Sequence, residues 1–328
     1  MKILSLLLLA TLLLTNNFNS PQETPELQEA TTLTASFIKL FNQGKYDQAL
    51  PLAKRALQIR EKALPRTDQR VVDSLINLGE VYIGKQDYRP ARDTFKRLLQ
   101  ILEERFGAED LRLASTLDRL APLQYRAGSF DEAEEAFKRA LAVREKALGS
   151  DNEETARAAF AIADFYRKRR DFQPAVENYT RAMTTYGRLS GVRTDAFERV
   201  RDGFYCLSYE HNKPDLGKEI ARIYSQFSGV DPSREPEPGT VLNGRAISLP
   251  KPEYPEGARQ RRLQGMVVVK VLIDETGTVI SAKDMCQGPP YLSEASVAAA
   301  FKARFTTTKL SGMPVKVPGV ITYNFVPR

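Results

Sequence analysis

The side chains able to do acid–base, nucleophilic or metal chemistry are few. The 328 residues include a single histidine, His211, and two cysteines, Cys206 and Cys286. A lone histidine beside a turn is more often a surface or capping residue than a metal ligand, and no cysteine or carboxylate cluster at metal spacing accompanies it. No Gly-x-Ser-x-Gly motif, phosphate loop or nucleophile–base arrangement occurs. We therefore expect no enzyme, no cofactor, no metal and no small-molecule substrate.

The two cysteines lie in different predicted domains, and two thiols do not make a disulfide framework. We favour two independent, small, buried residues at Cys206 and Cys286. A disulfide between the two domains remains the alternative.

The net charge of +7 is unevenly placed, because residues 255–328 contain ten Lys and Arg against five Asp and Glu. Such a bias can steer an acidic partner or an anionic surface, and a solvated basic face is the simpler interpretation. Basic and aromatic residues are not interleaved in a nucleic-acid motif. We therefore expect protein partners and no nucleic acid.

One short motif recurs along the chain and points to the elements that position everything else. It reads QGKYDQA from Gln43, KQDYRPA from Lys85, AGSFDEA from Ala127 and RRDFQPA from Arg169. Its aromatic residue and its last alanine each recur every 42 residues, at Tyr46, Tyr88, Phe130 and Phe172 and at Ala49, Ala91, Ala133 and Ala175. A fixed period in this range indicates a repeat array, in which helical hairpins bury their apolar faces against their neighbours.

The apolar residues within a unit follow helical spacing. One face of a first helix carries Leu75, Leu78, Val81 and Tyr82, and one face of a second carries Ala91, Phe95, Leu98 and Leu102. Small residues at Gly79, Ala121 and Ala163 are expected where the two helices approach closely. The bend aromatic is expected to fill the gap between units. Two departures are Phe37, at the small-residue position of the first unit, and Pro122, which costs ~3 kcal/mol inside a helix unless a kink absorbs it.

These features resemble the tetratricopeptide repeat (TPR), with LINLGEVY and ARDTFKRL as the two half-motifs, in its longer kinesin-light-chain variety. We assign about four repeats to residues 27–190. Residues 191–227 keep two helical patterns around an Asn-Lys-Pro-Asp turn but lose the repeat register, and we interpret them as a degenerate capping hairpin. Residues 228–252 are rich in Pro and Gly and are predicted to be a linker.

Residues 253–328 change character and predict a small α+β domain. A helix in PEGARQRRL precedes a hairpin with Gly277 in its turn, and a helix and a final strand follow. Within YLSEASVAAAFKARF, the predicted buried face contains Leu292, Ala295, Val297, Ala298 and Phe301; in the last strand Val315, Val317, Ile321, Tyr323 and Phe325 alternate. The segment resembles the C-terminal domain of TonB, the periplasmic energy transducer, with Tyr254-Pro255, Gly265, Asp274, Gly277, Arg304-Phe305, Gly312 and Pro314 as its marks. The fold class is thus an all-α TPR solenoid followed by a small α+β TonB C-terminal-like domain with an antiparallel sheet and helices.

The TonB resemblance implies a way of binding: a receptor peptide adds as a strand to the edge of the domain's sheet. The candidate edge is the final strand, and Pro318 within it, which has no N–H, favours an edge or a bulge. The strand-addition residues are Val315, Lys316, Val317, Val320, Ile321, Thr322, Tyr323, Asn324 and Phe325.

A repeat array also offers a concave groove, which non-core positions of the first helices would line. The candidate groove residues are Asp73, Asn77, Glu80, Asp118, Arg119, Tyr125, Arg126, Arg157, Asp164, Arg167 and Lys168.

The first 20 residues combine Lys2 with an apolar run from Ile3 to Leu14, too short to span a bilayer, and are expected to be a signal peptide. The leading hypothesis is a non-enzymatic periplasmic adaptor that binds protein partners through both surfaces, with outer-membrane receptors as candidate partners. One alternative is an energy-transducing TonB paralogue in transmembrane transport, which would keep the leader as an inner-membrane anchor. The other is an envelope scaffold that self-associates through the sheet edge.

Overall fold

The computed structural model describes residues 24–229, 245–310 and 312–326. The predicted signal peptide and most of the predicted linker therefore lie outside the described residues. The chain divides into two compact units, Met1–Gly107 and Ala108–Arg328. Within the described ranges, no helix has both the length and the apolar character needed to cross a membrane.

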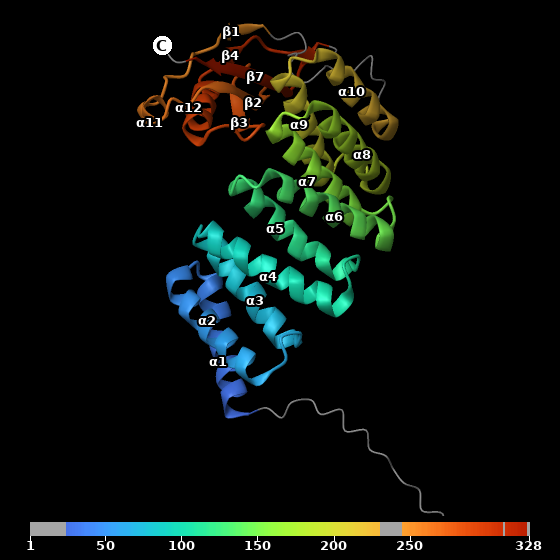
Figure 1. Cartoon of the computed structure of the whole chain (residues 1–328). Coiled ribbons are helices and arrows are strands. Elements are labelled where there is room, and N and C mark those ends of the chain that lie inside the picture. Colours follow the sequence, from blue (N-terminus) through green and yellow to red (C-terminus); the bar gives the residue numbers. More distant parts are fainter. Residues whose placement is uncertain (1–23, 230–244, 311, 327–328) are drawn as a thin grey trace, which may run out of the picture. The chain divides into compact units, whose positions relative to one another are not determined.

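The first unit consists of two antiparallel helical hairpins (Figure 1). Its helices are α1 (Pro25–Asn42), α2 (Tyr46–Ala63), α3 (Gln69–Gly84) and α4 (Tyr88–Phe106). The predicted apolar faces of α3 and α4 are buried, except that Tyr82 is half-buried. A Cβ atom at Gly79 would lie only 2.6 Å from the Phe95 ring, which confirms that this position has to be small. Phe37 is buried in spite of its size.

The second unit begins with three more hairpins. Its helices are α5 (Ala114–Arg126), preceded by the 3-10 turn η1 (Leu111–Leu113), α6 (Phe130–Leu148), α7 (Glu153–Arg169), α8 (Phe172–Ser190), α9 (Asp195–Glu210) and α10 (Pro214–Ser228). Helix α5 continues through Pro122, whose side chain is exposed. Pro122 is thus accommodated inside a helix. Pro214 begins α10, where the first turn needs no N–H from this residue.

The prediction that the last hairpin loses the repeat register is wrong. Helix α10 begins at Pro214, which is 42 residues after the start of α8 at Phe172. The residue two positions before each second helix has a positive φ in all five described hairpins, at Gly44, Gln86, Gly128, Arg170 and Asn212. The backbone bend is thus repeated, and only the side-chain types change.

The bend aromatics fill gaps in some repeats and not in others. A Cβ atom at Gly84 would lie 2.6 Å from the Tyr46 ring, so these two residues pack closely. The ring centroid of Phe172 lies 5.0 Å from that of His211, the residue that follows α9. Phe130, by contrast, is 45% exposed, so the expectation that it fills a gap is wrong.

The C-terminal domain is built on a three-stranded antiparallel sheet in the order β3-β2-β7. Its elements are β1 (Ala246–Ser248), α11 (Glu256–Gln260), β2 (Gly265–Ile273), β3 (Val279–Asp284), α12 (Pro290–Phe301), β4 (Arg304–Phe305), β5 (Lys309–Leu310), β6 (Met313–Pro314) and β7 (Val317–Phe325). Strand β1 pairs with β4, so residues 246–248 of the predicted linker belong to this domain. The hairpin turn needs its glycine: Gly277 has a φ of 87°, and a Cβ there would lie 1.8 Å from the Phe305 carbonyl oxygen.

The predicted buried face of α12 is partly wrong. The buried residues are Leu292, Ser296, Ala299 and Ala300, whereas Ala298 and Phe301 are exposed. A polar residue at position 296 hid the true spacing of three and four, but its hydroxyl donates a hydrogen bond to the Leu292 carbonyl at 2.7 Å and is satisfied inside.

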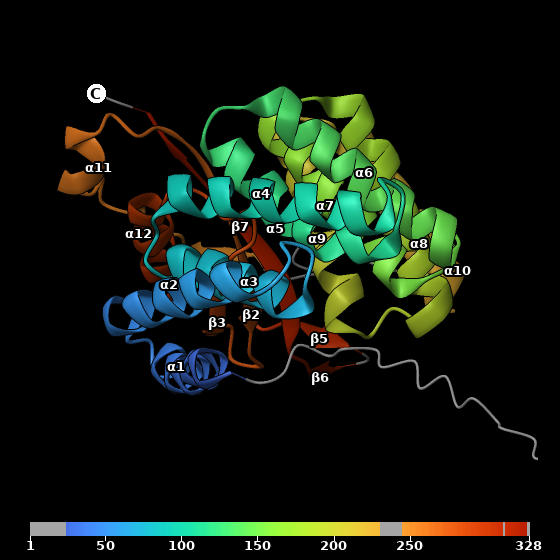
Figure 2. The ribbon, with the colours of Figure 1, turned by 60° about the horizontal axis from the view of Figure 1, so that its bottom comes forward.

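The two faces of the sheet meet different helices, and both views show the sheet between α12 and α9 (Figures 1 and 2). Odd-numbered residues of β2 and β7, such as Val269 and Ile321, form the domain core together with α12. Even-numbered residues Met266, Val268 and Val320 pack with Cys206 and Tyr209 of α9. The repeat array therefore supplies the cover for one face of the sheet.

Candidate protein-interaction surfaces

Three of the predicted groove residues belong to internal ion pairs. Arg167 of α7 is only 6% exposed. Its guanidinium donates to Asp164 Oδ1 at 2.7 Å and to Glu210 Oε1 of α9 at 2.6 Å. Burial favours a higher pKa for Asp164, but the charges of Arg167 and Lys168 prevail and lower it. Burial raises the pKa of Glu210. Arg167 and Asp164 thus join two hairpins, which corrects their assignment as groove surface.

Asp118 has a similar structural partner, the buried Arg144 of α6. Arg144 is 3% exposed, and its Nη1 donates to Asp118 Oδ1 at 3.1 Å. In the first unit the buried Arg60 donates to Ser74 Oγ at 2.6 Å. Neither arginine was predicted from the sequence, although a charged residue on an otherwise apolar helical face was a visible signal. Buried arginines need such partners, because an unpaired buried charge is very costly.

The remaining groove candidates lie nearer the surface. In the first unit, α3 carries Asp73, Asn77 and Glu80 on one exposed or half-buried face, and Asp73 accepts a hydrogen bond from Gln69. In the second unit, the candidates on α5 and α7 that are exposed or half-buried are Arg119, Tyr125, Arg126, Arg157 and Lys168. Arg157 pairs with Glu154, and Lys168 pairs with Asp164 at 2.6 Å. These surfaces are charged and suit polar contacts with a partner.

His211 is a packing residue in the described structure. It follows α9 as its C-cap residue and contacts the Phe172 ring. Burial and the nearby charges of Arg170 and Lys213 lower its pKa. In the described parts of the chain, no group of histidine, cysteine and carboxylate side chains is arranged to hold a metal ion.

Strand β7 lies at one edge of the sheet, and its backbone orientation follows from a single contact. The amide of Met285 donates to the Val268 carbonyl at 2.8 Å, so Val268 directs its backbone groups toward β3. Backbone direction alternates along a strand, so Val267, Val269 and Val271 face β7. They pair with Tyr323, Ile321 and Gly319. The backbone groups of Val320, Thr322 and Asn324 therefore face away from β2.

No strand pairs with that outer side of β7 within the residues that the structure describes. Pro318 has the same parity as Val320, so its missing N–H falls on the open side and removes no hydrogen bond to β2. The ladder with β2 continues without a bulge from Val317 to Phe325. Val315 and Lys316 precede β7, and the Val315 amide already donates to the Thr308 carbonyl at 3.0 Å. The open edge therefore begins at Val317, two residues later than predicted.

A disulfide attaches the domain to the last hairpin, and the expectation of two independent thiols is wrong. Cys206 of α9 and Cys286, which follows β3, are bonded with their Cα atoms 5.5 Å apart. The bond closes a sequence separation of 80 residues, and both cysteines are buried. A spacing this long gives no sequence signal, because only the packing of the sheet on α9 brings the two residues together.

An ion pair extends the same attachment. Lys270 Nζ of β2 lies 3.0 Å from Asp202 Oδ2 and 3.4 Å from Glu198 Oε2, both on α9. The α9 residues that contact the C-terminal domain lie on one face of the helix at helical spacing: Glu198, Asp202, Cys206 and Tyr209. That face lies along β2 from Lys270 to Met266.

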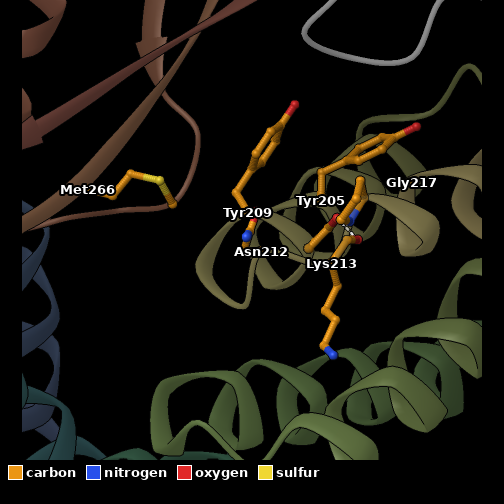
Figure 3. A pocket seen from close by; sticks show the side chains of 8 residues that line it. Tyr205, Tyr209, Asn212, Lys213, Gly217 and Met266 are labelled. Carbon is orange, nitrogen blue, oxygen red and sulfur yellow. Dashed lines mark hydrogen bonds between the residues drawn. The ribbon is translucent and has the colours of Figure 1, made fainter.

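A pocket of about 270 Å³ opens beside this attachment, between α9, α10 and the start of β2 (Figure 3). It is lined by Tyr205, Ser208, Tyr209, Asn212, Lys213, Pro214, Gly217 and Met266. None of these residues was predicted as a binding residue, since the hairpin was expected to be a simple cap.

Helical hairpins with a 42-residue period, joined to a small antiparallel sheet domain, define a two-domain repeat protein. The family model of the tetratricopeptide repeat matches residues 29–104 and 112–187. The model described as Gram-negative bacterial TonB protein C-terminal matches residues 250–327. The chain thus contains a TPR array followed by a TonB C-terminal domain, which confirms both resemblances.

A solved kinesin light chain structure agrees with the fold of the array. A putative kinesin light chain from Podosopora anserina with nearly identical TPR-like repeats is 14% identical; the match covers 63% of this chain and all (100%) of that one, with a TM-score of 0.53. BtubC from P. vanneervenii is 18% identical, with 65% of this chain and 78% of that one covered and a TM-score of 0.42. At 14% identity the likeness to the kinesin light chain structure concerns the fold alone. No curated protein matches the chain.

Proposed function

We propose that this protein is a non-enzymatic adaptor of the cell envelope that binds protein partners at two kinds of surface. One is the charged surface of the TPR first helices, and the other is the open edge of β7. A TPR array and a TonB C-terminal domain together support a protein-binding scaffold. The observation that carries the finer proposal is the outward direction of the Val320, Thr322 and Asn324 backbone groups.

Strand addition is the binding mode that such an edge favours. An extended peptide satisfies unpaired N–H and C=O groups along an edge, so main-chain hydrogen bonds provide affinity and side-chain pockets provide specificity. The edge offers donors at Val320, Thr322 and Asn324, and Pro318 adds only an acceptor. A partner peptide therefore pairs best with the second half of β7.

The proposed location is the periplasm. The leader pattern of residues 1–20 supports export, and the Cys206–Cys286 bond adds a second argument. Disulfides persist in oxidising compartments such as the bacterial periplasm and are rare in the cytosol. Sequencing the N-terminus of the mature protein tests this: a start near Pro21 supports release, and a retained leader supports the anchored transducer.

Site-specific photocrosslinking in the native cell envelope tests strand addition. A photoreactive residue replaces Asn324 at the open edge, and in a control protein it replaces the exposed Glu294 on α12. We expect a partner crosslinked from position 324 and not from position 294. Adding Thr322→Pro removes an outward donor and should abolish that crosslink, while Thr322→Ala keeps the donor and should preserve it.

A crosslink that survives Thr322→Pro unchanged would contradict strand addition. A crosslink only between two copies of the chain would favour the self-associating scaffold instead. Sedimentation of the full chain separates that case, because a monomer at high concentration excludes pairing through β7.

A further inference from the structure

The pocket lies where the other hairpins place an aromatic ring. In the first hairpin, Tyr46 begins α2, and its ring centroid lies 5.4 Å from that of Phe41 near the end of α1. In the third hairpin, the ring centroid of Phe130 lies 5.5 Å from that of Tyr125. The 42-residue register places Tyr209 at the position of Phe41 and Tyr125, and Pro214 at the position of Tyr46 and Phe130. The last hairpin therefore keeps one ring of this pair and lacks the other.

A second replacement shapes the floor of the same pocket. The second helices of the first four hairpins have alanine three residues after their start, whereas α10 has Gly217. A Cβ at Gly217 would lie 3.9 Å from the Tyr205 ring, an ordinary contact. The packing would therefore allow an alanine at position 217. The glycine leaves additional space beside Tyr205.

Two polar groups at the pocket, the Ser208 hydroxyl and the Lys213 ammonium, have other partners. The Ser208 hydroxyl donates to the Lys213 carbonyl at 2.7 Å. The Lys213 ammonium points away from the two tyrosines (Figure 3) and lies 6.0 Å from the centre of the Phe172 ring. The apolar part of the walls consists of the rings of Tyr205 and Tyr209, the ring of Pro214 and the thioether of Met266. Aromatic rings and thioethers bind other aromatic side chains well.

The pocket lies on the side of α9 that faces β7. Cys206 points toward Cys286, which follows β3, and Tyr205 points about 100° away, toward Gly217 of α10. Met266 pairs directly with Asn324 of β7. Val320 of β7 packs in the same cluster as Tyr209 and Met266. Side chains of a strand added to β7 would lie about 10 Å from β2, two strand spacings away, and alternate ones would face this pocket.

We infer that the pocket receives an aromatic side chain of the peptide that adds to β7. The inference rests on the proposed function, since the open edge fixes the peptide beside the pocket. The last hairpin has Pro214 where the other hairpins have an aromatic residue, and the partner supplies the missing ring. The partner is therefore an extended protein segment with an aromatic residue at one fixed position, and this pocket determines its specificity.

Selection of displayed 12-residue peptides on the immobilised full chain, followed by fluorescence anisotropy of the recovered peptides, tests this inference. We expect the recovered peptides to share a Phe, Tyr or Trp at one position. Pro214→Phe supplies the ring found at this position in α6 and α8, so it should fold normally and weaken peptide binding by at least about tenfold. Asp215→Phe adds the same ring at the next position, which is exposed and does not line the pocket, and serves as the matched control, with binding within about twofold of the original protein.

Thr322→Pro separates this inference from the proposed function. Loss of binding in Thr322→Pro, with unchanged binding in Pro214→Phe and no aromatic preference, would overturn the pocket's role and leave strand addition intact. Unchanged binding in Thr322→Pro would overturn strand addition. A selection that yields no peptide dependent on position 322 or 214 would overturn both. Thermal melts of each variant identify any loss of binding that comes from unfolding.

Discussion

The fourth and fifth hairpins have the same backbone bend and present different surfaces. In the fourth, Phe172 begins the second helix, and Arg167 joins the hairpin to α9 through Glu210. In the fifth, Pro214 and Tyr209 occupy the equivalent positions, and the bend borders a pocket. A repeat unit can thus keep its fold while its side chains change from internal closure to an open surface.

The same two hairpins differ in what covers them, and this difference shows how the array ends. An internal hairpin is covered by the next first helix, as α7–α8 is covered by α9. In the fifth hairpin, α9 is covered by the sheet of the C-terminal domain, attached by the Cys206–Cys286 bond and by Lys270. The domain therefore both covers α9 and carries the β7 edge.

The largest effect should come from opening the closed hairpin. Arg167→Met leaves Asp164 and Glu210 in their sites without their shared cation, and breaking a buried pair in this way costs ~3–5 kcal/mol. The urea midpoint of the full chain should fall accordingly. Lys168→Met, at a side chain that is 43% exposed, is the control and should cost less than about 1 kcal/mol. Equal effects of the two variants would show that Arg167 is not part of an internal network.

The next largest effect concerns the attachment of the sheet to the fifth hairpin. Replacing Cys206 and Cys286 together by alanine should lower the free energy of unfolding by about 2–4 kcal/mol, because the bond restricts the unfolded chain. Urea denaturation without reductant measures it, and reduced original protein should shift similarly. A thiol assay on the unfolded, unreduced protein should find no free thiol, and two free thiols would contradict the attachment.

A smaller difference should distinguish equivalent positions in the two second helices. Ala175 is fully buried, so Ala175→Phe should overpack the fourth hairpin at a cost of ~1–3 kcal/mol. At Gly217 there is room for a Cβ, and Gly217→Ala should be neutral or stabilising by up to about 1 kcal/mol through helix propensity. Thermal melts check both. A destabilised Gly217→Ala would mean that α9 and α10 pack more closely than the structure shows.

The smallest effect should come from the ion pair beside the disulfide. Lys270→Met removes the contacts with Asp202 and Glu198, and a partly exposed pair of this kind contributes about 0.2–1 kcal/mol. The difference from the original protein should shrink as salt increases, because salt screens such charges. Urea melts at low and high salt measure it, and a salt-independent loss would indicate lost packing instead.

The fold was predictable from the sequence because its signals are local and repeated. The bend aromatics and the alanines at 42-residue spacing predict the hairpins, and the alternation in Val317–Phe325 predicts β7. The register of the fifth hairpin was missed because residue types were compared, and Pro214 and Tyr205 do not look like their counterparts. The property that is repeated is the positive φ at Asn212, which no single residue type announces.

The candidate interaction surfaces were less predictable, because they depend on which elements meet. Arg167 has the spacing of a surface residue on α7 and is buried only because Glu210 of α9 reaches it. The disulfide and the pocket both need the sheet to lie on α9, and Met266 and Gly217 are far apart in the sequence. The edge position of Pro318 was predictable because a missing N–H is a local property of one residue.

Residue-resolved amide exchange along β7, with and without a recovered peptide, tests the central claim most directly. In the free chain, the amides of Val320, Thr322 and Asn324 should exchange quickly, while those of Gly319, Ile321 and Tyr323 should be protected by β2. Peptide binding should slow exchange at the first three and leave the others unchanged. Protection of Val320, Thr322 and Asn324 in the free chain, or no change in their exchange on binding, would contradict an open edge that binds partners.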